Sequence, residues 1–310
     1  MAGPRILVVG SSNTDMVVIS ERIPRAGETV TGGRFVMAAG GKGANQAVAA
    51  ARLGAEVTFI AKVGDDVFGR QAVDNYRNDG LRTDWIRFDA EHATGVALIL
   101  VDAQGENLIS VASGANFALG PDDIEQSTEA FSQQDILMLQ LETPAETVQA
   151  AAQLAAERQV AVILNPAPAP AEPLPRELLK HVTYLTPNET EAARLTGIEV
   201  CDEAAARAAA ERLLAAGVQH VVMTLGARGA LWADRNGSGL VASVAIEAVD
   251  TTAAGDAFNG ALGCALARGM ALPEAVREAC LAGALAATRE GAQPSLPTRA
   301  ELDAFVRRHA

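Results

Sequence analysis

The sequence is poor in cysteine. Cys201, Cys264 and Cys280 are its three cysteines in 310 residues, and none belongs to a CxxC pair or stands beside a histidine. Because a disulfide framework or a zinc site needs more numerous and more closely spaced cysteines, neither is predicted. This content is typical of a protein in a reducing compartment, and we expect a cytoplasmic location.

Long apolar runs and a leader segment are also missing. No uncharged apolar run approaches the ~18 residues that a membrane-spanning helix needs. The first ten residues, MAGPRILVVG, lack the basic, apolar and small-residue zones of a signal peptide. We therefore expect neither export nor a membrane as a partner.

Positive charge is scarce. The 25 Lys and Arg residues are outnumbered by 38 Asp and Glu residues, which gives a formal net charge of −13 at pH 7. Nucleic acids and anionic membranes bind to basic surfaces, so neither is expected as the main partner. An anionic small ligand would need local attraction from metal ions, helix N-termini or a few cationic side chains.

What the sequence does contain is a regular alternation of strand-like and helix-like segments. The strand-like segments are rich in Val, Ile and Leu, which is typical of the buried strands of a parallel sheet. They span residues 6–10, 57–63, 135–141, 160–165, 184–186 and 220–225. The helical segments span residues 44–53, 68–78, 144–158, 204–216, 254–268, 273–289 and 299–307. This order predicts an α/β fold, with a mainly parallel sheet flanked by helices on both faces.

Two regions, at about residues 14–38 and 94–111, break the alternation. Both show the period-two pattern of strands, interrupted by glycine and polar residues and without a helix between the paired runs. We expect them to form hairpins of a small extra sheet that lies as a lid over one edge of the large one. Residues 1–310 would then form a single α/β domain with a β lid.

The segment DTTAAGDAFNGA, residues 250–261, places two acids around a run of small residues. Ala253, Ala254 and Gly255 allow a tight turn, and Asp256 then opens an amphipathic helix whose free N–H groups form an anion site. Asp256 alone is equally typical of a helix N-cap. Asp250, predicted to end a strand six residues earlier, is not needed for a cap. A base beside an anion site suits phosphorylation of a hydroxyl group.

The segment AAGGKGANQAVAA, residues 38–50, is a glycine-rich entry into a helix. It is not a Walker A loop, because Gly43 follows Lys42 where Ser or Thr is required, and it is not GxGxxG. A plain helix entry is one interpretation. The other is that Lys42 and Asn45 bind vicinal hydroxyl groups.

Polar residues also follow other predicted strands. Asn13 and Asp15 follow the first strand and Glu142 follows the segment DILMLQL, and each could simply make turn hydrogen bonds. Together they are typical partners of a sugar's hydroxyl groups. In TPNETE, Asn188 and Glu191 have the spacing of a capping box. TLGARG, residues 224–229, ends a strand in glycines that suit a close approach to a nucleotide.

The ordered set GGKGAN, N-x-x-E, TLG-x-RG and DTTAAGDAFNGA resembles the ribokinase family of carbohydrate kinases, the phosphofructokinase-B superfamily. The resemblance runs over essentially the whole chain, from Asn13 to the closing segment REGAQPSLP. It implies ATP-dependent phosphorylation of D-ribose at its 5-hydroxyl group. It also implies Mg²⁺ as a cofactor, a monovalent cation such as K⁺ as an activator, and a homodimer formed through the lids.

The resemblance assigns roles to individual positions. Those expected to contact the sugar are Asn13, Asp15, Gly41, Lys42, Asn45, Glu142 and Asp256. Asp256 would be the general base, with the amides of Ala253, Ala254, Gly255 and Asp256 as the anion hole. Those expected to bind ATP and Mg²⁺ are Asn188, Glu191, Thr224, Gly226, Arg228, Gly229, Gly255 and Cys280. Those expected at the cation site are Asp250, Thr252, Ala286, Arg289, Gly291 and Ser295. Cys280 departs from the family pattern, which often has His or Asn near the adenine.

Three alternatives remain open from the sequence. A sister kinase acting on fructose, deoxyribose or a nucleoside such as adenosine would share the same motifs. A catalytically silent sugar-binding protein would not need Asp256 and its anion site. A dinucleotide-dependent dehydrogenase is disfavoured, because the first strand is followed by GSSNTD and not by GxGxxG.

Overall fold

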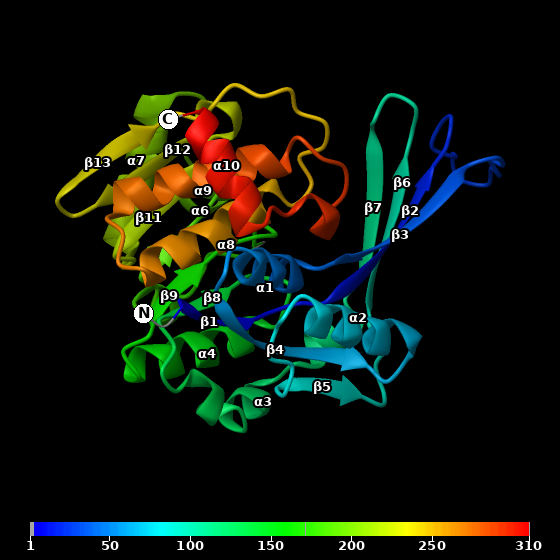
Figure 1. Cartoon of the computed structure of the whole chain (residues 1–310), viewed down its shortest axis with the longest axis horizontal. Coiled ribbons are helices and arrows are strands. Elements are labelled where there is room, and N and C mark those ends of the chain that lie inside the picture. Colours follow the sequence, from blue (N-terminus) through cyan, green and yellow to red (C-terminus); the bar gives the residue numbers. More distant parts are fainter. Residues whose placement is uncertain (1–2, 171, 310) are drawn as a thin grey trace.

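A computed structural model describes residues 3–170 and 172–309, which form a large nine-stranded sheet between two layers of helices (Figure 1). The strand order is β13-β12-β11-β10-β9-β8-β1-β4-β5, and all neighbours from β11 to β5 are parallel. The strands are β1 (Arg5–Val9), β4 (Glu56–Gly64), β5 (Ile86–Asp89), β8 (Ile136–Leu139), β9 (Ala161–Leu164), β10 (Tyr184–Leu185), β11 (His220–Thr224), β12 (Ala230–Asp234) and β13 (Gly237–Val241). The predicted fold class is confirmed.

Both faces of the sheet are buried because alternate strand residues point to opposite sides. In β1, Ile6 and Val8 belong to one hydrophobic core, and Leu7 and Val9 belong to the other. Helices α1 (Lys42–Arg52), α2 (Val67–Asn78), α8 (Ala254–Ala267), α9 (Leu272–Ala286) and α10 (Arg299–Arg308) pack on the first core. Helices α3 (Pro121–Glu125), α4 (Ala145–Glu157), α5 (Arg176–Leu179), α6 (Glu189–Thr196) and α7 (Glu203–Ala216) pack on the second.

A small sheet projects from the large one (Figure 1). Its strands are β2 (Asn13–Ile19), β3 (Arg34–Gly40), β6 (Gly95–Val101) and β7 (Asn107–Ala112), in the order β3-β2-β6-β7. β2 and β3 form one antiparallel pair, β6 and β7 form another, and β2 joins the pairs by running parallel to β6. The two sequence regions with strand-like alternation therefore supply this sheet.

The sequence patterns missed three strands and predicted one that does not exist. β5 and β13 are the two edge strands of the large sheet, and β12 pairs with β13 and β11; all three are short, with four or five residues each. The strand predicted to end at Asp250 is wrong, because residues 242–253 form neither helix nor strand. Within the described ranges, no helix is both long and apolar enough to cross a membrane.

Candidate active site

Helix α8 begins with a strained turn. Ala253 precedes it in the left-handed region with φ of 59°, which is unfavourable for a residue with a Cβ. Among the described residues, the N–H groups of Gly255 and Asp256 have no acceptor, whereas that of Ala254 donates to the Thr251 carbonyl at 3.2 Å. Free N–H groups at the positive end of a helix attract an anion. The turn thus leaves two free N–H groups where the sequence predicts an anion site.

The carboxylate of Asp256 lies in the interior. The N-cap position belongs to Ala253, so the N-cap interpretation of Asp256 is wrong. Instead, its Oδ2 accepts a hydrogen bond of 2.9 Å from Asn45 Nδ2, and its Oδ1 accepts one of 3.1 Å from Gln46 Nε2. Burial raises the pKa of Asp256, against the opposing effects of Lys42 and the two amides. A raised pKa makes a carboxylate a stronger base.

The glycine-rich segment holds these amides in place. Gly41, with φ of 88°, is the N-cap of α1, and a Cβ there would lie 2.8 Å from the backbone nitrogen of Asn13. Glu142 Oε2 accepts hydrogen bonds from the Lys42 N–H at 2.9 Å and from Ser11 Oγ at 2.5 Å. One oxygen of Glu142 thus stabilises the start of α1. Its other oxygen has no hydrogen-bond partner among the described residues.

Lys42 is surrounded by acids. Burial alone would lower its pKa, but Asp256, Glu142 and Glu191 outweigh this effect and raise it. Lys42 is therefore a permanent cation at neutral pH. It supplies local positive charge in a protein whose net charge is negative.

Asn13 and Asp15 lie on one face of β2, two residues apart. Their cross-strand neighbours are all Gly or Ala: Gly40, Gly95, Ala38 and Ala97. A Cβ at Gly40 would lie 2.3 Å from an Asp15 oxygen, and one at Gly95 would lie 2.2 Å from Asn13 Oδ1. The small neighbours leave space for two polar side chains on this face. The burial of Asp15 raises its pKa to about 6, with further contributions from Glu142 and Asp256.

Two adjoining cavities, of about 850 and 200 Å³, meet at the start of α8 and share Asn188, Thr224, Thr251 and Gly255. Predicted nucleotide residues that line the larger one are Asn188, Thr224, Gly226, Gly229, Gly255 and Cys280. Apolar residues of its wall include Val244, Ile246, Phe258, Ala284 and Ala287. The smaller cavity contains Lys42, Glu191 and Asp256. This arrangement suits a long ligand with an apolar end and an anionic end that reaches Asp256.

Four predicted nucleotide residues differ in their surroundings. Asn188 and Glu191 form the capping box of α6, with reciprocal hydrogen bonds of 2.8 Å, and both also line the smaller cavity. Arg228 does not line either cavity; it pairs with Glu189. Burial raises the pKa of Cys280 to about 12, so its thiol faces the larger cavity in the neutral form.

Asp250, Thr252, Arg289 and Gly291 of the predicted cation site lie in two loops that Asp250 joins, whereas Ala286 ends α9 and Ser295 ends the 3₁₀ helix η4 (Gln293–Ser295). Asp250 Oδ1 accepts from the Thr252 N–H at 2.8 Å, and its Oδ2 accepts from the Gly291 N–H at 2.9 Å. These hydrogen bonds lower the pKa of Asp250 despite its partial burial. Nearby, Arg289 pairs with Glu301, and the Ser295 hydroxyl donates to the Ala292 carbonyl. Across the described residues, no group of three or more His, Cys, Asp or Glu side chains could hold a metal ion.

Comparisons with known proteins agree with this geometry. Residues 4–299 match the pfkB family of carbohydrate kinases. The chain belongs to this family. It is 44% identical to a ribokinase of Haemophilus influenzae over 301 residues, covering 97% of this chain and 98% of the relative. It is 36% identical to a deoxyribokinase of Salmonella typhi, covering 97% and 98%. The structure of an Arabidopsis thaliana ribokinase complexed with ribose and ATP has a TM-score of 0.93 at 32% identity, covering 99% of each chain.

Several polar residues of this pfkB kinase site were not found from the sequence. Gln46 follows Asn45 directly and contacts Asp256, and its Oε1 accepts a hydrogen bond of 2.7 Å from Gln140 Nε2. Asn165 accepts from Gln46 and lines the smaller cavity, and Asn116 contacts Asn13. The available signal was their position, since Gln140 and Asn165 each follow a buried strand. Asn116 carries no such signal.

We predict that Asp15→Asn stabilises the protein in a pH-dependent way. The Asp15 pKa is about 6 in the folded state against an ordinary value of 3.8, so the folded state retains a proton that the unfolded state releases. Stability therefore falls as pH rises from about 4 to 6 and is level above that range. Removing the carboxylate should raise the free energy of unfolding by up to ~3 kcal/mol at pH 8 and by much less at pH 4.

Urea unfolding of wild type and Asp15→Asn at pH 4, 6 and 8 measures this difference. Asp84→Asn, at an exposed carboxylate, is the matched control for removing one negative charge. A stability difference that is equal at all three pH values would contradict the prediction.

Proposed function

We propose that this kinase transfers the γ-phosphoryl group of ATP to O5 of D-ribose and so makes D-ribose 5-phosphate. The observation that carries the proposal is the buried Asp256 carboxylate, fixed by two amides beside free helix N–H groups. It lies between a nucleotide-sized cavity and the polar face of β2. Phosphoryl transfer to a hydroxyl group requires a base between the phosphate donor and the acceptor. Here the cavity would hold the donor, Asp256 is the base, and the face of β2 would hold the acceptor.

Asp256 is the general base in this proposal. Its carboxylate takes the proton of the sugar's 5-hydroxyl group as the oxygen attacks phosphorus. The amides of Gly255 and Asp256, with the turn at Ala253 and Ala254, stabilise negative charge on the transferring group. Because phosphoryl transfer depends on alignment and charge stabilisation, the fixed orientation of Asp256 is as important as its basicity.

The sugar lies between the small sheet and the start of α1. Its hydroxyl groups bind Asn13, Asp15, Gly41, Lys42, Asn45 and Glu142. The free oxygen of Glu142 and the carboxylate of Asp15 accept hydrogen bonds, and Lys42 donates them. The small sheet acts as a lid that excludes water from the reacting groups.

ATP occupies the larger cavity and extends toward Asp256. Asn188, Thr224, Gly226, Gly229 and Cys280 line its path, and Arg228 lies next to it through its partner Glu189. Glu191 faces the smaller cavity and fits Mg²⁺ through bound water, because its own oxygens already accept from Asn188. The ion would neutralise phosphate charge that the acidic chain cannot.

A monovalent cation, K⁺ by family resemblance, fits the two loops joined by Asp250. Asp250, Thr252, Ala286, Arg289, Gly291 and Ser295 form its surroundings. The lowered pKa of Asp250 keeps its negative charge available to such an ion. By ordering residues 250–252, the cation would fix the turn that precedes α8.

The small sheet also supports a homodimer. Phe35, Met37, Leu98 and Leu108 are more than half exposed and lie on the face opposite Asp15, as the strand registers require. Exposed apolar patches of this kind mark protein interfaces. A second copy would cover both patches by symmetry. The buried free thiols of Cys264 and Cys280 favour a reducing, cytoplasmic environment.

We predict strong ribose-dependent release of ADP from ATP and Mg²⁺ across a panel of ribose, 2-deoxyribose, fructose and adenosine. Asp256→Asn should lower kcat ~10²- to 10⁴-fold because it removes the base. Asp84→Asn is the control. Preference for another acceptor would make the protein a sister kinase, and binding of ribose without turnover would favour the silent sugar-binding protein.

We predict that K⁺ raises turnover relative to an assay without monovalent cations, and that Asp250→Ala abolishes this activation. The variant loses both the carboxylate and the hydrogen bonds that join the two loops. The measurement is initial rate against K⁺ concentration, with Asp84→Asn again as control. Wild-type rates that do not depend on K⁺ would contradict the cation site.

We predict that the protein has twice its chain mass of 32.1 kDa in solution. The double substitution Met37→Glu with Leu98→Glu should make it monomeric, because it places charges in the apolar patch. Light scattering after gel filtration measures the mass. Val67→Glu, at an exposed apolar side chain on α2, is the control. A wild-type protein that is monomeric at all concentrations would refute the proposed dimer.

A further inference from the structure

Asn116 is a buried asparagine at the base of the small sheet, and the mechanism above does not use it. It lies in the short 3₁₀ helix η1 (Gly114–Ala118), which follows β7 after Ser113. Its side chain is 2% exposed. On the opposite side of the same junction, Ser12 directly precedes β2. Asn116 therefore lies in the segment that leaves the small sheet after β7 and bonds to the segment that enters it before β2.

The hydrogen bonds of Asn116 fix the orientation of its amide. Its Oδ1 accepts from the Ser12 N–H at 2.8 Å, and a backbone N–H can only donate. Its Nδ2 must then be the donor on the other side, where it reaches the Ser12 carbonyl at 3.2 Å and Asn13 Oδ1 at 2.7 Å. If the Asn116 amide were flipped, its NH₂ group would face the Ser12 N–H. Its oxygen would then face the Ser12 carbonyl and Asn13 Oδ1.

The orientation of Asn116 also determines that of Asn13. Because Asn13 Oδ1 accepts from Asn116, the NH₂ group of Asn13 is the end left available to a ligand. Gly95 makes this contact possible, since a Cβ there would lie 2.2 Å from Asn13 Oδ1 and 2.3 Å from Asn116 Nδ2. The site thus offers a donor from Asn13 beside the acceptor oxygens of Asp15.

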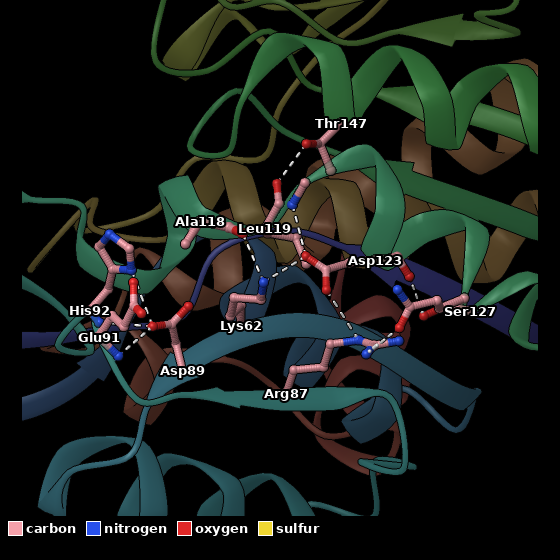
Figure 2. A network of polar contacts seen from close by, with 12 residues as sticks. Lys62, Arg87, Asp89, Glu91, His92, Ala118, Leu119, Asp123, Ser127 and Thr147 are labelled. Atoms are coloured by element: carbon pink, nitrogen blue, oxygen red, sulfur yellow. Dashed lines mark hydrogen bonds and ion pairs between the residues drawn. The ribbon is translucent and has the colours of Figure 1, made fainter.

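The helix that carries Asn116 is itself anchored to the large sheet, as Figure 2 shows in part. Lys62 on β4 donates to the Ala118 carbonyl at 2.8 Å and pairs with Asp123 at 2.7 Å. Arg87 on β5 approaches the other Asp123 oxygen at 3.4 Å. At the start of η1, the Ala115 N–H donates to the Ala93 carbonyl at 2.8 Å. Through the Lys62 hydrogen bond, the helix of Asn116 is therefore tied to the large sheet as well as to the small one.

We propose that Asn116 is a positioning residue that orients the Asn13 amide for sugar binding. The helix of Asn116 links Asn13 to the large sheet. The hydrogen bond from Asn116 to Asn13 Oδ1 turns the NH₂ group of Asn13 toward a sugar oxygen. The inference rests on the proposed function, in which Asn13 contacts the sugar. Asn116 touches neither sugar nor nucleotide and acts through Asn13 alone.

The test is a double-mutant cycle between Asn116 and Asn13. Asn116→Ala should raise the KM for ribose about tenfold, as the loss of a buried hydrogen-bond partner implies, and leave the KM for ATP within twofold. In an Asn13→Ala background, the same substitution should change the ribose KM less than twofold, because the residue through which it acts is gone. Asn236→Ala, at an exposed turn asparagine, is the matched control.

A second variant keeps the test decisive if Asn116→Ala folds poorly. Asn116→Asp retains the acceptor for the Ser12 N–H but cannot donate to Asn13 Oδ1, so Asn13 must turn its carbonyl toward the sugar. It should also raise the ribose KM, and this effect should also vanish in the Asn13→Ala background. Thermal unfolding of every variant reports folding separately from binding.

The outcomes separate this inference from the proposed function. The cycle is run on whichever sugar of the panel the wild type phosphorylates best, with sugar affinity also measured by calorimetry without ATP. A preferred sugar other than ribose would overturn the proposed substrate, while the cycle would still decide the role of Asn116. The positioning role would be overturned if Asn116→Ala raised the sugar KM by the same factor in the wild type and in the Asn13→Ala background. A wild type that binds no sugar would overturn both.

Discussion

The hydrogen bonds between the Asp256 carboxylate and the amides of Asn45 and Gln46 are the interaction on which the site depends. A buried carboxylate is costly unless its oxygens are paired, and the two amides pair one oxygen each. They come from the first turn of α1, whereas Asp256 comes from the first turn of α8. These contacts therefore bring the starts of two helices, more than two hundred residues apart in sequence, to one point.

The electrostatics of the site follow from this arrangement. Asp15, Glu142, Glu191 and Asp256 are close enough to influence one another's pKa or that of Lys42. One lysine among four acids cannot by itself attract an anionic nucleotide. Helix N–H groups and cations must supply the remaining positive potential, which explains why the free amides of α8 lie next to the carboxylate.

The small sheet contributes to the site through its base and not through its tip. Asn13 is the first residue of β2, and Gly40 and Gly95 beside it are the last residue of β3 and the first of β6. Because glycine has no side chain, these positions leave room for polar groups where the small sheet meets the large one. Lys62 on β4 donates to the Ala118 carbonyl at the end of the adjacent helix η1, so this junction is also tied to the large sheet.

The sequence by itself determined the α/β class, the two regions of the small sheet and the segments whose polar residues line the two cavities. It could do so because buried strands and amphipathic helices have distinct periods, and because glycine turns before helices are local features. It did not reveal the short strands β5, β12 and β13, nor that residues 242–253 form no strand. Only the tertiary structure decided that Asp256 bonds to amides of α1 and does not cap its own helix, and that Gln46, Asn116 and Asn165 lie beside the predicted site residues. These are contacts between distant segments, and no local pattern encodes which polar side chains will meet when helices and strands pack.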